Sequence, residues 1–192
     1  MMDPGLQKLK DLIADVRYNG DQHTDIKVKE NDPSATLRTL NIKTTNGDWF
    51  MFDPDRGRGA SKKMSPILSV GTSYEHHKAC DAVILVKNCG EQYALFIELK
   101  SSSRQGGFKG QLRSTRCFLK YLLYIAEEFH SVQFPIIKER FIVFHSTKSK
   151  KTTLSKKPTI FQRTSVLLGD PNNPRKEIIS DGATFYLKDL LN

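Results

Sequence analysis

The chain has 192 residues, of which 38% are hydrophobic, and a formal net charge of +9. This length and apolar content exclude disorder over the whole chain and are sufficient for one domain with a buried core. No apolar run reaches about eighteen residues and the N-terminus has no continuous apolar segment, so we expect no transmembrane helix and no signal peptide, and we place the protein in the cytoplasm.

The net charge indicates the class of binding partner, and the cysteines indicate the redox state of the cellular compartment. A basic excess of this size favours a polyanionic partner, most often nucleic acid, although a solvated basic surface without a partner gives the same count. The three cysteines are odd in number and lack paired spacing. They predict neither a disulfide framework nor a zinc site, and they indicate a reducing compartment.

The N-terminal part reads as one helix followed by strands and loops. Residues 6–17 predict an amphipathic helix, because apolar side chains recur every three or four positions. Residues 19–36 are polar and indicate an irregular link. Residues 37–52 predict a hairpin about Asn46-Gly47, a two-residue turn signal. Residues 53–66, rich in glycine, proline and basic side chains, indicate an exposed loop.

The middle of the chain gives the strongest patterns. Residues 81–87 and 93–100 are rich in β-forming side chains and predict two strands joined by a tight turn. Residues 101–107 indicate a loop, and residues 108–129 predict a long amphipathic helix. A buried strand is expected at residues 140–145.

The C-terminal part is less regular. The stretch 147–157 contains five lysines and predicts a basic loop. Further strands are expected at residues 160–168 and 184–187, with a turn at 170–174 between them and a short helix at the end. Together the elements predict an α/β fold, with a central mixed sheet flanked by helices in a single domain over residues 1–192.

Three charged residues converge if the turn between the two central strands centres on Cys89-Gly90. Asp81 then faces Glu98, with their Cβ atoms about 4.5–5.5 Å apart. Strand periodicity places Lys100 on the same face as Glu98. A register slip of one residue would put the two carboxylates on opposite faces, so the cluster depends on this pairing.

These charges end otherwise apolar strands, where an unpaired charge costs several kcal/mol. A divalent cation would offset both the free-energy cost of burying the carboxylates and their mutual repulsion. An oxygen-rich site suits Mg²⁺ or Mn²⁺. A neighbouring lysine can orient or deprotonate an attacking water, or neutralise charge in a transition state. The plain alternative is that Asp81 and Lys100 end their strands in solvent and that Glu98 pairs with Lys100.

Asp81, a gap of sixteen residues and then Glu98-Leu99-Lys100 resemble the motif of the PD-(D/E)XK nuclease superfamily. Cys80 stands where that family often has proline, whereas the Glu-X-Lys part is complete. The resemblance covers about residues 67–145 and implies the restriction-endonuclease-like fold, with an αβββαβ core.

The resemblance also implies roles for individual residues. Asp81 and Glu98 would hold the metal, the backbone carbonyl of Leu99 is a candidate third ligand, and Lys100 would serve the attacking water. Gln111 resembles the helix glutamine that assists the site in several branches, although a partly exposed glutamine at a helix start fits the sequence equally well. Glu75 is a further candidate ligand, because some members add an acidic residue.

Basic side chains around these elements form a candidate phosphate-tracking surface, although each alone is more often a plain surface residue. The candidates are Lys62, Lys63, Arg104, Lys109, Arg113 and Arg116, together with the run at 147–157.

The sequence therefore predicts a Mg²⁺- or Mn²⁺-dependent nuclease, more specifically an endonuclease, with DNA as the favoured substrate. One alternative is a non-catalytic nucleic-acid-binding protein or accessory subunit on the same fold. Another is an RNA endonuclease, since some RNA-cutting relatives add a histidine ligand and His76 and His77 are near. The resemblance allows a homodimer or a larger nuclease complex, and no membrane partner is expected.

Overall fold

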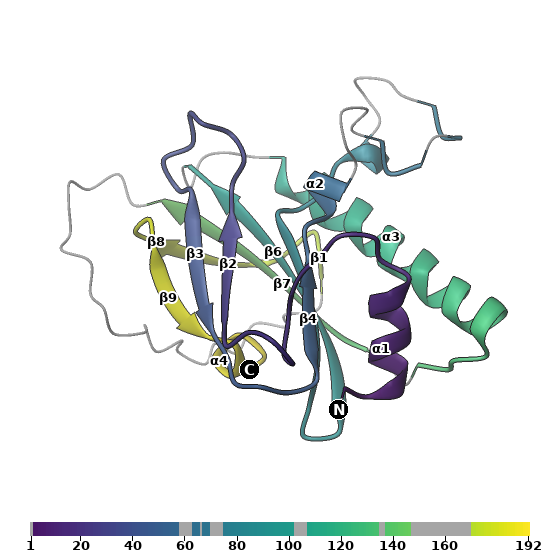
Figure 1. Cartoon of the computed structure of the whole chain (residues 1–192). Helices are drawn as coiled ribbons and strands as arrows, with labels where there is room; N and C mark the ends of the chain where they lie inside the picture. Colours follow the sequence, from purple (N-terminus) through teal and green to yellow (C-terminus); the bar gives the residue numbers. More distant parts are fainter. Residues whose placement is uncertain are drawn as a thin grey trace.

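A computed structural model describes residues 2–57, 63–65, 67–69, 75–101, 107–134, 137–146 and 170–192. The fold is α/β, with a mixed six-stranded sheet in the order β1-β4-β5-β6-β7-β8 and a second sheet in the order β2-β3-β9 (Figure 1). The strands are β1 (Val16–Asn19), β2 (Asp25–Lys29), β3 (Thr39–Lys43), β4 (Trp49–Phe52), β5 (Ala82–Asn88), β6 (Glu91–Lys100), β7 (Lys138–Ser146), β8 (Arg175–Ile179) and β9 (Ala183–Tyr186). The helices are α1 (Pro4–Asp11), α2 (Pro54–Gly57), α3 (Phe108–His130) and α4 (Leu187–Leu190), with a single 3-10 turn, η1 (Glu75–His77).

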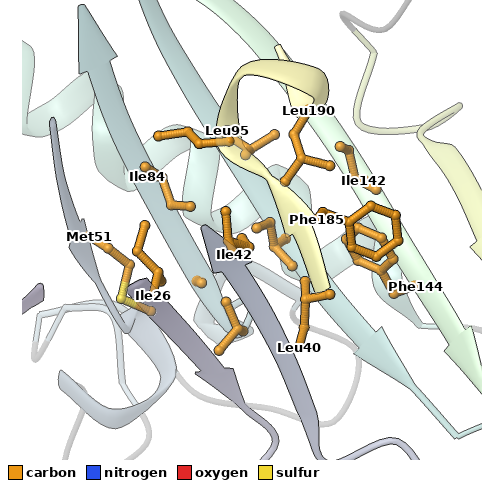
Figure 2. Packing of buried hydrophobic residues seen from close by; sticks show 14 of the residues in the cluster. Ile26, Leu40, Ile42, Met51, Ile84, Leu95, Ile142, Phe144, Phe185 and Leu190 are labelled. Carbon is orange, nitrogen blue, oxygen red and sulfur yellow. The ribbon is translucent and has the colours of Figure 1, made fainter. Parts of the chain in front are cut away.

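The elements form three layers, because the central strands are buried on both faces. Alternate side chains of β5 and β6 point to opposite sides of the large sheet, as the twofold period of a strand requires. Ile84 and Leu95 belong to an apolar cluster shared with the small sheet (Figure 2). Val83 and Phe96 belong to a second cluster shared with α1 and α3. The small sheet thus covers one face and the two helices cover the other.

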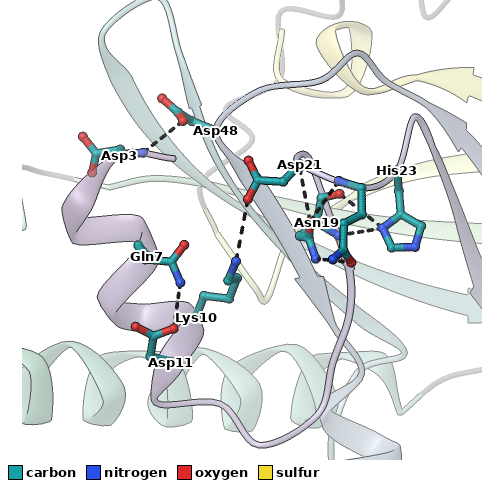
Figure 3. Close-up of polar contacts among 9 residues, drawn as sticks. Asp3, Gln7, Lys10, Asp11, Asn19, Asp21, His23 and Asp48 are labelled. Atoms are coloured by element: carbon teal, nitrogen blue, oxygen red, sulfur yellow. Dashed lines mark hydrogen bonds and ion pairs between the residues drawn. The ribbon is translucent and has the colours of Figure 1, made fainter. Parts of the chain in front are cut away.

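Helix α1 is tied to the large sheet at its first turn. The Asp3 carboxylate accepts hydrogen bonds from the backbone N–H groups of Gly5 and Leu6, which caps the helix, and its other oxygen lies 2.6 Å from Lys87 Nζ on β5. The Asp3 N–H donates to Asp48 at 3.0 Å (Figure 3). These contacts fix the start of α1 beside β5.

The prediction of an α/β fold with a central mixed sheet is confirmed. The expected flanking by helices holds for one face only, because the small sheet covers the other face. The two central strands, the long helix and the strand expected at residues 140–145 correspond to β5, β6, α3 and β7. The expected C-terminal strand and short helix correspond to β9 and α4. The N-terminal helix is shorter than predicted, because it ends at Asp11 and the chain enters β1 at Val16.

The predicted hairpin at residues 37–52 is wrong. Both strands form, but β3 pairs with β2 and β9, whereas β4 pairs with β1 and β5. All four residues of β4 are buried, so this strand needs a neighbouring strand at each edge and a covering layer on each face. β3 belongs to the small sheet, which is the layer on one of these faces. The Asn46-Gly47 segment therefore connects two sheets.

Three further predictions are corrected. The polar stretch 19–36 is not wholly irregular, because it contains β2, whose side chains alternate between exposed and buried. The loop expected at residues 53–66 begins with the buried Asp53 and the short helix α2. Strand β8 was not expected and pairs parallel with β7.

Three predictions fall wholly or mostly on parts of the chain that the structure does not describe, namely most of the loop at 101–107, the basic loop at 147–157 and the strand at 160–168. Among the described residues, no helix is both long enough and apolar enough to cross a membrane.

Truncating Leu40 tests whether the small sheet stabilises the fold. Leu40 is fully buried on β3 between the two sheets, so Leu40→Ala should lower the free energy of unfolding by about 2–5 kcal/mol through lost burial and a cavity. Urea unfolding followed by circular dichroism measures this. Lys27→Ala, on the exposed face of β2, is the control and should change stability by less than about 0.5 kcal/mol. Equal stabilities of the two variants would contradict the three-layer packing.

Candidate active site

Asp81, Glu98 and Lys100 meet at the open end of the β5–β6 hairpin. The pairing Ala82 with Ile97 continues without a slip to Asn88 with Glu91. The Asp81 N–H donates to the Ile97 carbonyl at 3.1 Å, although Ile97 is the partner of Ala82. This bond is one residue out of step with the ladder, so the pairing becomes irregular at Asp81. The predicted register is therefore confirmed from Ala82 to Asn88. The charges of Asp81 and Glu98 lie close enough to interact, but their direct opposition across the hairpin stays a prediction.

The three side chains are buried although each can carry a charge. Glu98 is 0% exposed, Asp81 6% and Lys100 8%. Lys100 Nζ lies 2.5 Å from Glu98 Oε1, which is ion-pair distance, and Asp81 Oδ2 accepts the Leu99 N–H at 2.6 Å. Neither Glu98 oxygen accepts a well-aligned hydrogen bond from the described residues. Glu98 therefore has spare acceptor capacity in a place where water is excluded.

Helix α3 holds the cluster from one side through polar residues on its inner face. Gln111 accepts a hydrogen bond from Lys100 Nζ at 2.8 Å and donates to the Ala79 carbonyl at 3.2 Å. Thr115, fully buried, accepts the Cys80 N–H at 3.0 Å. Gln111 thus connects Lys100 to the segment that leads into Asp81. Its predicted placement near Lys100 is confirmed, and its catalytic role stays a prediction.

The small sheet approaches the cluster from the other side. In the connection between β2 and β3, the Thr36 N–H donates to the Ser101 hydroxyl and the Thr36 hydroxyl donates to the Ser101 carbonyl, both at 3.0 Å. Ser101 directly follows Lys100. Glu30 directly follows β2, and in this arrangement its charge acts on both Asp81 and Glu98.

Burial and like charge dominate the electrostatics of the two carboxyls. Burial raises the pKa of Glu98 to about 7, and Lys100 offsets part of this rise. Burial also raises the pKa of Asp81 well above its usual range, and the charges of Glu98 and then Glu30 add to the effect. Without a cation, therefore, the cluster favours bound protons near neutral pH.

Sequence reasoning missed several residues at this end of the fold. Glu30 and Thr36 lie in the stretch that was expected to be irregular. The alternation of Asp25-Ile-Lys-Val-Lys29 was a signal for a strand, and that strand carries Glu30 to the site. His145, buried on β7, pairs in register with Lys100 and shares its face of the sheet. Partner choice across the parallel β6–β7 pair has no local sequence signal.

Other candidates lie around the cluster. Glu75 is exposed, pairs with Lys78 at 2.9 Å and lies against Gly110, where an added Cβ would come within 2.6 Å of its carboxyl carbon. The rings of His76 and His77 both approach the Ser69 carbonyl, at 3.0 Å. None of these contacts joins Glu75 or the histidines to Asp81, and a ligand role for Glu75 stays a prediction.

The predicted phosphate contacts are only partly described. Lys109 and Arg113 are exposed on α3, and Lys63 is half-buried. Arg116 makes an ion pair with Glu139 on β7, 2.7 Å from Nη2 to Oε2, so its charge is partly neutralised. Lys62 and Arg104 lie outside the described residues.

The described residues contain no group of three or more histidine, cysteine, aspartate or glutamate side chains arranged to hold a metal ion. The donors at the cluster still fit Mg²⁺ or Mn²⁺ in kind, because Mg²⁺ commonly takes one or two carboxylates and completes its shell with water and substrate phosphate. Lys100 is the ion-pair partner of Glu98 Oε1, whereas Oε2 accepts no hydrogen bond from the described residues. This buried oxygen, in a carboxylate whose charge acts on Asp81, is the observation that favours the fit. The Leu99 side chain is in the inter-sheet core, and its carbonyl stays a candidate ligand.

Comparison with known proteins adds no relative, because no family model, curated protein or solved structure matches the chain significantly. The resemblance noted in the sequence therefore depends on the residues and their arrangement alone.

The raised pKa values predict a pH-dependent stability. In the folded protein Glu98 keeps its proton to higher pH than in the unfolded chain, so its stabilising contribution is complete below the ordinary pKa of 4.5 and is lost as the pH rises through about 7. In EDTA, the free energy of unfolding should fall from about pH 5 to about pH 8, and Glu98→Gln should remove part of this fall, on the order of a few kcal/mol.

Urea unfolding at the two pH values measures the difference. Glu91→Gln, an exposed carboxylate at the turn end of the same hairpin, is the matched control and should follow the wild type. A pH dependence that is the same in wild type and Glu98→Gln would show that Glu98 is not buried as a protonated group.

Proposed function

We propose that the chain is a Mg²⁺- or Mn²⁺-dependent nuclease of the PD-(D/E)XK type, which hydrolyses phosphodiester bonds, with DNA as the favoured substrate. The observation that carries the proposal is the buried cluster of Asp81, Glu98 and Lys100 at the open end of one hairpin. A structural ion pair would need only one carboxylate for Lys100. The second, repelling carboxylate is accounted for by a cation-binding role.

The order of elements supports the family assignment. Helix α1, strands β4, β5 and β6, helix α3 and strand β7 follow one another as α, β, β, β, α, β, with β1 to β3 inserted after α1 and with α2 and η1 between β4 and β5. The four strands are neighbours in the order β4-β5-β6-β7. This is compatible with an αβββαβ core, to which the edge strands β1 and β8 and the small sheet of β2, β3 and β9 are additions.

Each residue of the cluster has a role that follows from its contacts. Asp81 and Glu98 would hold the cation, which when bound polarises the phosphate and lowers the pKa of a coordinated water. Lys100 would present its ammonium group to the attacking water or to the charge that develops on the phosphate. Gln111 keeps Lys100 in place, because its side-chain oxygen accepts a hydrogen bond from Lys100 Nζ. Glu30 adds negative charge, which strengthens cation binding.

The substrate class is inferred from charge. The net charge of +9 and the exposed Lys109 and Arg113 near the cluster favour a polyanion over a neutral substrate. A carboxylate pair would repel phosphate unless a cation lay between them. This favours a metal-dependent nuclease over a protein that only binds nucleic acid.

Nuclease activity is tested with plasmid, single-stranded DNA and matched RNA in Mn²⁺ or Mg²⁺. Asp81→Asn, Glu98→Gln and Lys100→Met should each lower the cleavage rate by about a hundredfold or more, because each removes a group that acts on the transition state. Glu91→Gln, at the far end of the hairpin, should cleave as the wild type does. Cleavage that persists in all three site variants would refute the assignment, and metal-independent binding without cleavage would favour the non-catalytic alternative.

Cation binding gives a readout that does not depend on cleavage. A cation must displace protons held by Glu98 and Asp81, because the pKa values of both carboxyls are raised. Calorimetric titration with Mn²⁺ should therefore show net proton release at about pH 6.5, and the affinity should increase toward about pH 8. Glu98→Gln should abolish most of the release. Mn²⁺ binding with no change in bound protons would show that these carboxyls are not the ligands.

A further inference from the structure

The outward face of α3 carries an exposed row of basic and aromatic side chains. Lys109, Arg113, Lys120, Tyr121 and Tyr124 recur at intervals of four, seven, one and three residues and are all exposed. With 100° between successive residues they fall within a stripe about 120° wide. We call these five residues the α3 track. The buried residues of the helix, among them Leu112 and Leu119, lie on the opposite side.

The α3 track has an unusual charge balance. From Phe108 to Ala126 the helix contains four basic residues and no acidic one, and the exposed Glu127 and Glu128 follow in its last turn, beyond the end of the track. Arg116 is paired with Glu139, which leaves Lys109, Arg113 and Lys120 as the basic members of the track. Glu75 lies near Arg113, but its hydrogen-bonded partner is Lys78. The surface therefore suits an extended polyanion.

The two tyrosines add a second kind of recognition. Tyr121 is 61% exposed and Tyr124 is 66% exposed, and the two lie about one turn apart beside Lys120 in the same stripe. Tyr124 and Lys120 also border a hollow of about 660 Å³, whose lining includes Phe134. Aromatic faces beside basic residues match the way in which proteins bind single strands, where unpaired bases stack on rings and phosphates meet lysine and arginine.

The α3 track begins at the end of the helix that reaches the candidate active site. Lys109 lies two residues before Gln111, which holds Lys100, but on the outer side of the helix. Fifteen residues separate Lys109 from Tyr124, which is a rise of about 22 Å along the helix. At about 3.4 Å for each nucleotide of a stacked strand, this length accommodates roughly six nucleotides.

We propose that the α3 track binds a single-stranded segment of the nucleic-acid substrate, with phosphates on Lys109, Arg113 and Lys120 and unpaired bases on Tyr121 and Tyr124. The proposal builds on the nuclease assignment and narrows its substrate to one with a single-stranded region. A duplex offers the same phosphates but hides the faces of its bases, so the tyrosines distinguish the two substrates.

The test measures binding in EDTA, without cleavage. The probes are a labelled oligothymidylate of about twenty nucleotides, longer than the α3 track, and a duplex of the same length. Tyr121→Ala and Tyr124→Ala should each weaken binding of the single strand roughly tenfold and change duplex binding less than about twofold. Tyr124→Phe should retain the affinity, because stacking does not need the hydroxyl.

Phe129→Ala is the matched control, since Phe129 is an exposed aromatic residue on α3 outside the stripe, and it should leave binding unchanged. Lys120→Ala should reduce the slope of log affinity against log salt by about 0.7, as loss of one phosphate contact to a single strand requires. Lys27→Ala on β2 should not change the slope.

Several outcomes would overturn the proposal. The first is an oligothymidylate affinity that is unchanged in both tyrosine-to-alanine variants. The second is a loss of duplex affinity in these variants as large as their loss of single-strand affinity. The third is a wild type that does not bind the single strand. If the tyrosine-to-alanine variants lose single-strand binding but the wild type never cleaves nucleic acid, the α3 track is supported and the nuclease assignment is refuted. If cleavage is lost in Asp81→Asn but is unchanged in the tyrosine-to-alanine variants, the nuclease assignment is supported and the α3 track is refuted.

Discussion

The candidate site depends on the complete burial of one carboxyl group, that of Glu98. The strand that carries it is apolar on both faces and lies in the middle of a six-stranded sheet, so Glu98 cannot turn to solvent. An isolated carboxylate in such a place is costly, and the protein reduces this cost in two ways. Lys100, two residues along the strand, provides an opposite charge, and the raised pKa of Glu98 lets the group bind a proton instead. Asp81 brings a second carboxyl group to the same end of the hairpin, and its negative charge makes ionisation of Glu98 less favourable.

Two separate layers hold this unstable arrangement in place. On the helix side, Gln111 and Thr115 form hydrogen bonds with the segment before Asp81, so α3 cannot shift without disturbing the start of β5. On the sheet side, Thr36 fixes the β2–β3 connection to Ser101, directly after Lys100. Fixed neighbours on both sides mean that little reorganisation would accompany binding of a cation, which is the condition for strong electrostatic catalysis.

The hairpin and its register could be predicted because all the necessary signals are local. Two apolar strands flank a tight turn in which Cys89 and Gly90 take positive φ values of 50° and 81°. The turn sets the pairing, and the pairing sets which side chains face each other. The motif residues could be named for the same reason. The amphipathic pattern of α3 was equally local, and it placed Gln111 on the inner face.

Assignments that needed distant partners could not be made from the sequence. The strands around Asn46-Gly47 had the pattern of a hairpin, but β4 is buried on both faces, and this requires β1 and β5 as neighbours. β3 then pairs with β9, which lies about 140 residues further along the chain, and no local pattern encodes such a parallel contact. Glu30 was missed because its approach to Asp81 depends on this same packing. The part of the site made by the hairpin was therefore predictable, and the part made by docking of the small sheet was not.

Helix α3 connects the chemistry of the site to the surface around it. Its first two turns mix polar and apolar side chains on the inner face, because Gln111 and Thr115 serve the cluster while Phe108 and Leu112 pack in the apolar core. The later turns are held by apolar residues such as Leu119 and Leu122. The position of α3 is therefore set by hydrogen bonds and apolar packing together at the site end, and by apolar packing at the far end. Its outer face is consequently held rigidly relative to Lys100, so any ligand bound along the helix would have a fixed geometry with respect to the buried carboxylates.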